Sequence, residues 1–435
     1  GLPLAVALLA TMLATAGVVA EQVDLTVYVR TGLNPLEEQL QTLVFDIFEE
    51  DNPHIKLSLV TDAGSPNYHD KLLSLWAAGD PPDVWDHGGP VMTYAKDGWL
   101  LDLAPFVQRD KAEMRVNEFL PAAWRAYESN GHIWGIPFAA GASYLTYNAD
   151  MFDDSGLAYP PVDWGDTSWN WSKVKEYARK LVERDANGVM IKAGFGFGRY
   201  SYLNLPYIWA YGGDWFDEET YRTGVLHQPT LDSPNTIRAM EEIQAMVHEM
   251  RVAPENMGWD AAAFAEGRVG MHMGEGVIFG VTEADVGIRW GIAPFPAGTQ
   301  IAPSIIYTDP WMISSQTSVP EEAWAFVKFM TSPKVAQEYM KVSSFTSARR
   351  SFIGPQVEKL ARQTKNQSPK QVMSVMSTAH AYGREALDHV ITDYQGRLLP
   401  AIQPAMDAIW NNEKAARVAL TEAQRVLEGI AAGSK

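Results

Sequence analysis

The feature that most constrains the fold is a regular alternation of strand-like and helix-like segments that begins after residue 20. Leu25, Val27 and Val29 alternate with polar or amphipathic neighbours, which predicts a strand that ends at Arg30. The next segments are predicted to be a helix over about 35–51, a strand over 55–59, a helix over 68–78 and a short buried strand over 82–85. This order predicts an α/β fold with a parallel sheet and right-handed crossovers.

The remainder of the chain continues the alternation, without a short repeat or a low-complexity linker. Further helices are predicted at about 172–184, 234–251, 320–331, 333–342 and 413–431, and further strands at about 133–138, 143–147, 268–273, 288–295 and 305–313. Open parallel sheets bind ligands outside the carboxyl ends of their strands. The residues that directly follow each strand are therefore the candidate site residues.

Composition excludes several classes of protein. The 435 residues include no cysteine, which excludes a disulfide framework, thiolate catalysis, cysteine-ligated zinc and a lipid-modified cysteine anchor. Asp and Glu outnumber Lys and Arg by 53 to 35, so the formal charge is −18. A field of this sign repels phosphate backbones, and we expect no nucleic-acid partner. Fifteen Trp and 17 Tyr supply large amphipathic rings suited to holding a partly apolar ligand.

The first twenty residues carry no charge and then give way to Glu21, Gln22 and Asp24. An apolar run that ends in Val18-Val19-Ala20 is typical of a signal peptide with a small-residue cleavage site. A basic start is missing and the first residue is Gly1, so we expect a signal peptide with a truncated start, and a mature chain from about Glu21. The alternative is an uncleaved membrane anchor, since about 19 apolar residues approach a bilayer span.

A series of short motifs resembles the extracellular solute-binding proteins of family 1, which include maltose-binding proteins. The strongest stretch is Trp134-Gly135-Ile136-Pro137-Phe138 followed by Tyr147-Asn148-Ala149-Asp150-Met151-Phe152. The other motifs, in chain order, are Pro82-Asp83-Val84, Gly98–Leu103, Trp171-Ser172 with Ser172 as the helix N-cap, Asp232-Ser233-Pro234, Phe264–Met271, Ala293–Gly298 and Ala323–Val327. No single motif is specific to this family, but the order of the motifs over about residues 25–340 is specific to it.

The resemblance implies a periplasmic-binding-protein type II fold, in which two α/β lobes joined by a hinge close on a ligand. It places residues 21–139 and 301–345 in one lobe, and 140–300 and 346–435 in the other. It implies a monomer, outside the cytoplasm in the periplasm or at the cell surface, that captures a sugar or oligosaccharide and delivers it to the permease subunits of an ABC importer.

Three loops supply the first predicted ligand contacts. In the family, the loop after the third strand contacts the ligand; here it holds Asp86, a hydroxyl acceptor, and His87, a donor or stacking ring. Asp86 could instead cap the next helix. At the first crossing Gly141 departs from the family's polar contact, and Tyr144 lies either in the cleft or in the core. Tyr202 falls on the family's stacking position, or packs within its lobe.

The remaining predicted contacts follow later strands. Glu275, after a strand ending at Met273, is a predicted acceptor at the cleft rim. Near the second crossing, Asp309 is a predicted acceptor and Trp311 a predicted stacking platform, although a tryptophan in the core explains Trp311 equally well. Aromatic rings for the C–H faces and carboxylates for the hydroxyls suit an uncharged sugar.

Three alternatives remain open from the sequence. The same fold could bind an anion, a polyamine or a metal, and Arg30, Arg199 and Arg349 are the basic residues near predicted strand ends. The protein could also be an adhesin or a sensor that takes no part in transport. A secreted carbohydrate-active enzyme is less favoured, because the chain has no Gly-x-Ser-x-Gly or His-Glu-x-x-His motif and no spaced metal-ligand set. Gly194, Gly196 and Gly198 match no nucleotide motif and predict a flexible or a close-packed strand. We expect no cofactor.

Overall fold

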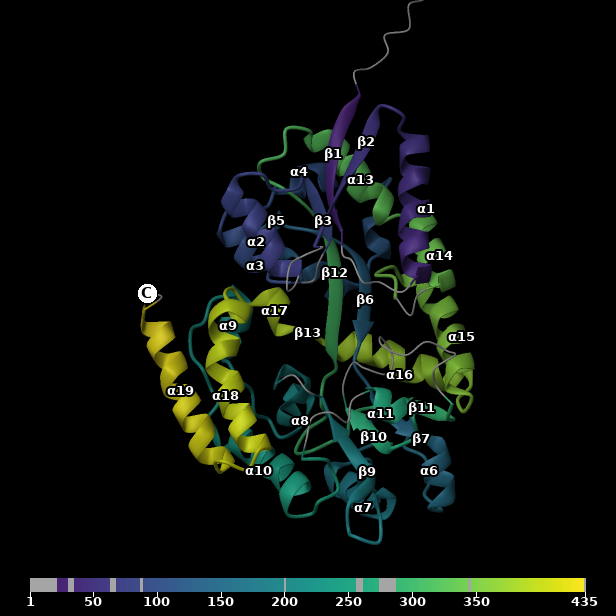
Figure 1. Cartoon of the computed structure of the whole chain (residues 1–435), viewed down its shortest axis with the longest axis vertical. Helices are drawn as coiled ribbons and strands as arrows, with labels where there is room; N and C mark the ends of the chain where they lie inside the picture. Colours follow the sequence, from purple (N-terminus) through teal and green to yellow (C-terminus); the bar gives the residue numbers. More distant parts are fainter. Residues whose placement is uncertain are drawn as a thin grey trace, which may run out of the picture.

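The structure is a computed structural model of the 435-residue chain, and it describes residues 22–29, 35–62, 68–86, 89–198, 201–255, 261–273, 287–342 and 346–433. Two α/β lobes lie one above the other in Figure 1, each built around its own sheet. We call the lobe that contains β1 the upper lobe and the other the lower lobe.

The upper lobe is built on a six-stranded sheet of order β13-β12-β3-β1-β2, with β6 also paired to β12. Its strands are β1 (Val23–Val29), β2 (Ile55–Thr61), β3 (Val84–Asp86), β6 (Ile136–Ala142), β12 (Ile305–Ile313) and β13 (Arg384–Glu385). β1 pairs in parallel with β2 and β3, whereas β12 runs antiparallel to β3 and β6. The three parallel strands confirm the β-α-β-α-β prediction.

Helices cover both faces of this sheet, and the alternation along β1 shows why. Leu25, Val27 and Val29 pack in one hydrophobic cluster with Trp311, while Tyr28 packs in a second cluster on the opposite face. The elements around the sheet are α1 (Pro35–Asp51), α2 (Tyr68–Ala78), α3 (Val91–Lys96), α4 (Ala104–Asp110), a 3₁₀ turn (Val116–Glu118), α5 (Pro121–Arg125), the hairpin β4 (Glu128–Ser129) and β5 (His132–Ile133), α13 (Pro320–Met330) and α14 (Pro333–Val342).

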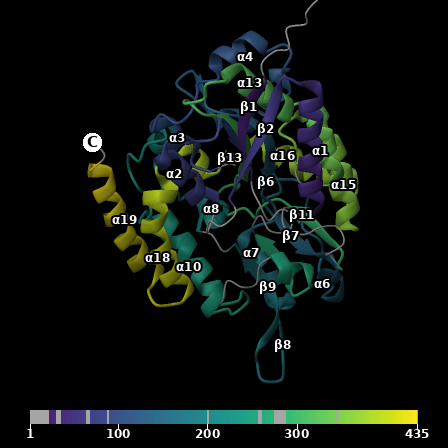
Figure 2. The ribbon, with the colours of Figure 1, turned by 45° about the horizontal axis from the view of Figure 1, so that its top comes forward.

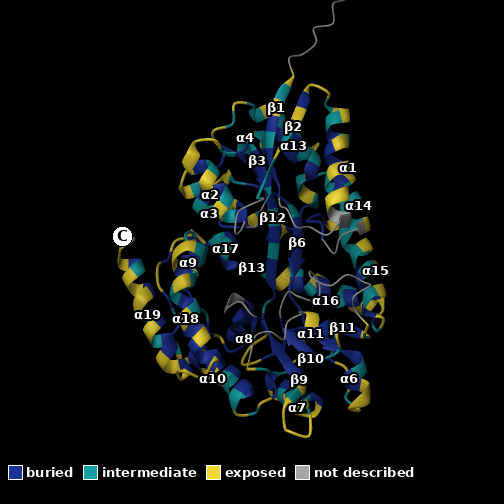
Figure 3. Ribbon diagram, in the orientation of Figure 1, coloured by how far each residue is buried: buried dark blue, intermediate teal, exposed yellow. Residues whose placement is uncertain are grey.

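The lower lobe has a five-stranded sheet of order β11-β7-β10-β9-β8. Its strands are β7 (Leu145–Asn148), β8 (Glu183–Arg184), β9 (Met190–Phe197), β10 (Val269–Met273) and β11 (Trp290–Ala293). β7 and β10 are buried along their whole lengths, as the dark strands in Figure 3 show. Helices therefore have to cover both faces.

Helices of the lower lobe come from two stretches of the chain. The first gives α6 (Ala149–Asp154), α7 (Trp171–Leu181), a 3₁₀ turn (Ser201–Asn204), α8 (Leu205–Ala210), α9 (Glu218–Thr223), α10 (Pro234–His248) and α11 (Ala261–Ala265). The second gives a 3₁₀ turn (Arg350–Phe352), α15 (Ile353–Thr364), α16 (Pro369–Tyr382), α17 (Leu387–Val390), a π-helical turn (Tyr394–Leu398), α18 (Leu399–Trp410) and α19 (Ala416–Gly433). Figure 2 shows α10, α18 and α19 side by side on one flank.

Helix α7 tests two expectations, the identity of its N-cap and the close packing of the glycine-containing strand against it. Asn170, not Ser172, is the N-cap of α7, because its side chain accepts from the backbone N–H of Lys173. Gly194 lies in β9 directly against α7: a Cβ there would be 2.0 Å from the carbonyl oxygen of Ala178. The predicted close-packed strand is therefore correct for Gly194.

Two antiparallel strands, β6 and β12, connect the lobes. Their register pairs Ile306 with Ala142 at the lower end and Trp311 with Ile136 at the upper end, with an irregularity between Asp309 and Pro310. The lobe boundaries expected from the resemblance, at 139/140 and 300/301, fall within β6 and shortly before β12. The exact lobe boundaries given above stay a prediction.

Candidate ligand-binding site

The carboxyl ends of β1, β2 and β3 point the same way, toward the lower lobe (Figure 1). β3 ends at Asp86, which is the register partner of Trp311 in β12. β12 continues from there into the lower lobe, so Asp309 is on the part of β12 that extends beyond β3. The fold thus brings two of the predicted acceptors, Asp86 and Asp309, to the boundary between the lobes.

Tyrosines hold the backbone around Asp86. Tyr68 donates its phenol hydrogen to the backbone oxygen of Asp86 over 2.7 Å, and Tyr28 donates to the backbone oxygen of Tyr68 over 2.7 Å. The rings of Tyr28 and Tyr68 are 4.3 Å apart between centroids. Burial, assisted by the charge of Asp62 at the end of β2, raises the pKa of Tyr28. Asp86 therefore has a fixed backbone position, as a specific hydrogen-bond acceptor requires.

A second group surrounds Tyr127, which is fully buried and donates to the backbone oxygen of Thr308 over 2.5 Å. Burial raises the pKa of Tyr127 well above its usual value, and the charges of Asp309 and Asp388 raise it further. Asp388 belongs to α17, and it also opposes the lowering of the pKa of His69 that burial causes. The charges of Asp309 in β12 and Asp388 in α17 therefore both act on Tyr127, and Asp309 is two residues along β12 from Trp311, the register partner of Asp86.

This arrangement favours a ligand that is rich in hydrogen-bond donors. Carboxylates are acceptors only, and bonds to an ionised acceptor are about twice as strong as neutral ones. In the part of the chain that the structure describes, no three His, Asp or Glu side chains are placed to hold a metal ion. Ionised carboxylates in this position have the chemistry to accept hydrogen bonds from donor groups of a ligand.

The other predicted contacts fall in two groups. His87 and Glu275 lie outside the described residues, and Tyr202 is described only through its backbone, in the 3₁₀ turn Ser201–Asn204. Tyr144 is buried in the core of the lower lobe. Trp311 is 1% exposed and packs against Phe326, with 5.1 Å between ring centroids. Neither of these two rings presents a free face in this arrangement.

The arginines named for an anion site are also accounted for where they are described. Arg349 is buried, donates to the backbone oxygens of Thr331 and Met114 over 2.7 and 3.1 Å, and lies over the ring of Phe119. Burial lowers its pKa to about 10. Its role is to tie segments of the upper lobe together. Arg30 and Arg199 lie outside the described residues.

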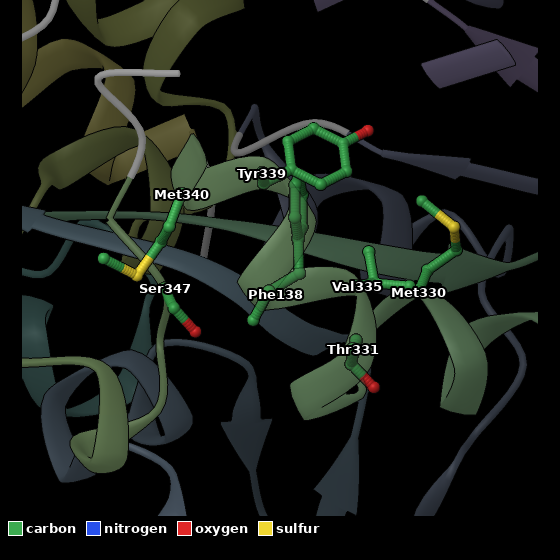
Figure 4. Close-up of a pocket in the computed structure, with 8 residues that line it drawn as sticks. Phe138, Met330, Thr331, Val335, Tyr339, Met340 and Ser347 are labelled. Atoms are coloured by element: carbon green, nitrogen blue, oxygen red, sulfur yellow. The ribbon is translucent and has the colours of Figure 1, made fainter. Parts of the chain in front are cut away.

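Two pockets among the described residues lie beside strands of the upper sheet. A notch beside β6, lined by Phe138, Thr331, Tyr339 and Ser347, holds about 10 Å³, roughly the room for one water molecule (Figure 4). A larger pocket of about 620 Å³ lies beside β13. There the guanidinium of Arg384 lies 4.4 Å from the ring centroids of Trp209 and Tyr221 and covers one face of each ring.

Sequence reasoning missed Tyr68, His69, Tyr127 and Asp388. Tyr68 and His69 begin a predicted helix, seven residues after β2 ends at Thr61. No motif distinguishes them. Asp388 lies in the last ninety residues, where the family motifs give no guidance. Only the crossing of the chain between lobes brings it beside Tyr127.

Two α/β lobes joined by a pair of crossing strands, with acceptors at the strand ends between them, define a periplasmic-type binding protein. The chain belongs to the bacterial extracellular solute-binding proteins, whose family model matches residues 34–337. No helix in the described ranges is long and apolar enough to cross a membrane.

Individual relatives are distant in sequence and close in fold. The chain is 25% identical to the maltotriose-binding protein of Pyrococcus abyssi over an alignment of 286 residues. This alignment covers 63% of this chain and 56% of that protein. The chain thus spans a little over half of the length of that curated relative. Maltose-bound MalE3 of T. maritima matches with a TM-score of 0.73 and 21% identity, over 94% of this chain and 100% of that one. A substrate-binding protein of Listeria monocytogenes in complex with cycloalternan matches with a TM-score of 0.74 and 20% identity, over 94% of this chain and 99% of that one.

Proposed function

We propose that the protein captures a sugar or sugar oligomer outside the cytoplasm and delivers it to the permease subunits of an ABC importer. The observation that carries this proposal is the position of Asp86 and Asp309 where β3 ends and β12 extends toward the lower lobe of an extracellular solute-binding protein, with the charge of Asp388 acting on the same Tyr127 as that of Asp309. The similar proteins described above support sugars as the ligand class. In this proposal the protein binds and releases its ligand unchanged.

Asp86 and Asp309 act as acceptors for sugar hydroxyl groups, and His87, Tyr202 and Glu275 complete the site from the loops around it. Tyr144 and Trp311 act from the cores of their lobes, by supporting the strands that carry the contacts. A signal peptide over residues 1–20 and a monomeric mature protein complete the proposal.

A thermal-shift screen over mono- and oligosaccharides, polyols, amino acids, polyamines and inorganic anions tests the ligand class. A ligand that binds only the folded state raises the melting temperature by mass action, so a sugar should raise it at millimolar concentration or below. Stabilisation by an anion or a polyamine, and by no sugar, would reject the sugar assignment. Incubation with the stabilising oligosaccharide, followed by product analysis, separates binding from hydrolysis.

A further inference from the structure

A short segment between the lower-lobe helices α16 and α18 reaches the upper lobe beside the crossing strands. It starts with β13, Arg384–Glu385, which pairs with β12 at the edge of the upper sheet, continues through α17, Leu387–Val390, and ends at Asp393. α17 packs against α3 of the upper lobe, to the left of β12 in Figure 1. We call residues 384–393 the bridging segment.

The lower end of the bridging segment is fixed to the lower lobe. The guanidinium of Arg384 pairs with Asp214 over 2.7 Å, and it lies 4.4 Å from the ring centroids of both Trp209 and Tyr221. Tyr221 also donates to Asp214 over 2.6 Å. Because a paired and sandwiched arginine has little freedom, this end moves with the lower lobe.

Three contacts join the bridging segment to the upper lobe. Glu385 pairs with Arg125 of α5 over 3.1 Å. Asp393 pairs with Lys96 of α3 over 2.9 Å, and its backbone N–H donates to the side-chain oxygen of Thr93 over 2.8 Å. The two contacts of Asp393 do not involve the crossing strands, whereas Glu385 belongs to β13, which pairs with the crossing strand β12.

The contacts lie at different distances from the hinge. Glu385 belongs to a strand that pairs directly with Ile305 and Ile306 of β12, so it is close to the axis of any rotation. Asp393 lies beyond α17, at the far end of the bridging segment. A rotation displaces atoms in proportion to their distance from the axis, so opening should separate Asp393 from Lys96 before it separates Glu385 from Arg125.

The backbone of Asp393 is shaped for this contact. Its φ is 58°, in the left-handed region that Asp tolerates better than most residues. This turn starts the π-helical turn Tyr394–Leu398 and directs the N–H of Asp393 at Thr93 while its carboxylate meets Lys96. One residue thus supplies both a donor and an acceptor to α3.

We propose that Asp393, with Lys96 and Thr93, forms a latch that stabilises the arrangement of lobes seen in this structure over more open arrangements. The inference rests on the proposed function, because a solute-binding protein retains its ligand through lobe closure. The latch is a side-chain contact that water and salt can reach, with the side chain of Lys96 54% exposed. It should bias the equilibrium and not lock it.

The distance between the lobes can be measured without any ligand. The chain has no cysteine, so Leu43→Cys in the upper lobe and Val189→Cys in the lower lobe, both exposed, give two unique spin-label sites. We expect part of the ligand-free population at the distance of this structure in pulsed EPR. Lys96→Met should lower the ratio of this population to the more open one by about two- to fivefold. Asp393→Asn, which keeps the shape and the tolerance for the left-handed turn, should do the same.

Lys334→Met is the matched control, since Lys334 pairs with Asp51 over 2.9 Å within the upper lobe and is as exposed as Lys96. It should leave the distances unchanged. Salt at 1 M should open the parent protein and have little added effect on Lys96→Met. Equal distance distributions for the parent and Lys96→Met, or no population at the distance of this structure, would overturn the latch.

The proposed function fails on a different measurement. If Lys96→Met changes the EPR distance distribution but no sugar raises the melting temperature, the latch is supported and the sugar assignment is rejected. If a sugar raises the melting temperature but Lys96→Met leaves the distances unchanged, only the latch is rejected.

Discussion

Gly194 of β9 lies directly against the backbone of Ala178 in α7, with room for a hydrogen atom and for nothing larger. We expect Gly194→Ala to lower the free energy of unfolding by about 3 kcal/mol or more, because a backbone, and not a flexible side chain, has to move. Denaturant unfolding measures this. Gly354→Ala, near the start of α15 with no atom within 4 Å of the added Cβ, should be neutral or slightly stabilising. Equal effects of the two changes would contradict the packing described here.

Arg349 offers a second test of the upper lobe. Arg349→Met keeps the length of the side chain but leaves the carbonyls of Thr331 and Met114 without their donor. We expect a loss of about 3–5 kcal/mol in the free energy of unfolding. Arg115→Met removes an exposed arginine 3.5 Å from Glu118 and should change stability by less than about 0.5 kcal/mol.

His380 of α16 predicts how stability depends on pH. Its Nδ1 is buried and has no hydrogen-bond partner among the described residues, and burial lowers its pKa from 6.5 to about 4. Between these two values the unfolded chain binds a proton that the folded chain does not. The contribution of His380 to stability is thus complete above about pH 6.5 and is lost as the pH falls toward 4.

The check is the pH dependence of the melting temperature, measured for the parent protein and for His380→Gln. The variant should lose less stability between pH 7 and 4.5 than the parent does. His132→Gln, at a half-exposed ring beside Asp102, should not reduce the loss in this way. Parallel curves for the parent and His380→Gln would show that His380 is not the group that titrates.

The acceptors of the proposed site predict a selective loss of affinity. Asp86→Asn and Asp309→Asn keep the size of each side chain and remove its charge, and each should weaken binding of the sugar found by the screen by about ten- to a hundredfold. Calorimetry measures the change. Asp24→Asn, at the opposite end of β1, is the control and should bind as the parent does. Unchanged affinity in both site variants with intact folding would show that the ligand binds elsewhere.

Periodicity predicted the elements well where one face alone is buried or where breakers flank a segment. α2 and α14 have the predicted bounds of 68–78 and 333–342, and β12 has those of 305–313. The predicted N-cap of α7, Ser172, was wrong. Asn170 and Ser172 are both residue types that cap helices, and only the direction of the incoming backbone selects between them.

The site was less predictable than the fold. Asp86 and Asp309 follow from strand ends and crossing points, which are local features of the sequence. Tyr127 and Asp388 are 261 positions apart, and no pattern in either segment announces their proximity. Trp311 shows the opposite problem, because an aromatic residue beside a crossing has the same sequence signature whether it faces a ligand or the core.

β6 and β12 also decide what kind of motion the molecule can make. The two strands share a hydrogen-bond ladder, and the side chain of Thr308 in β12 donates to the backbone oxygen of Ala139 in β6. Together they form a thin two-stranded ribbon. Such a ribbon bends across its thin dimension, whereas sliding or splaying would break the ladder. We therefore expect bending of this ribbon to be the favoured motion of one lobe against the other, along which a small bias suffices to select the end point.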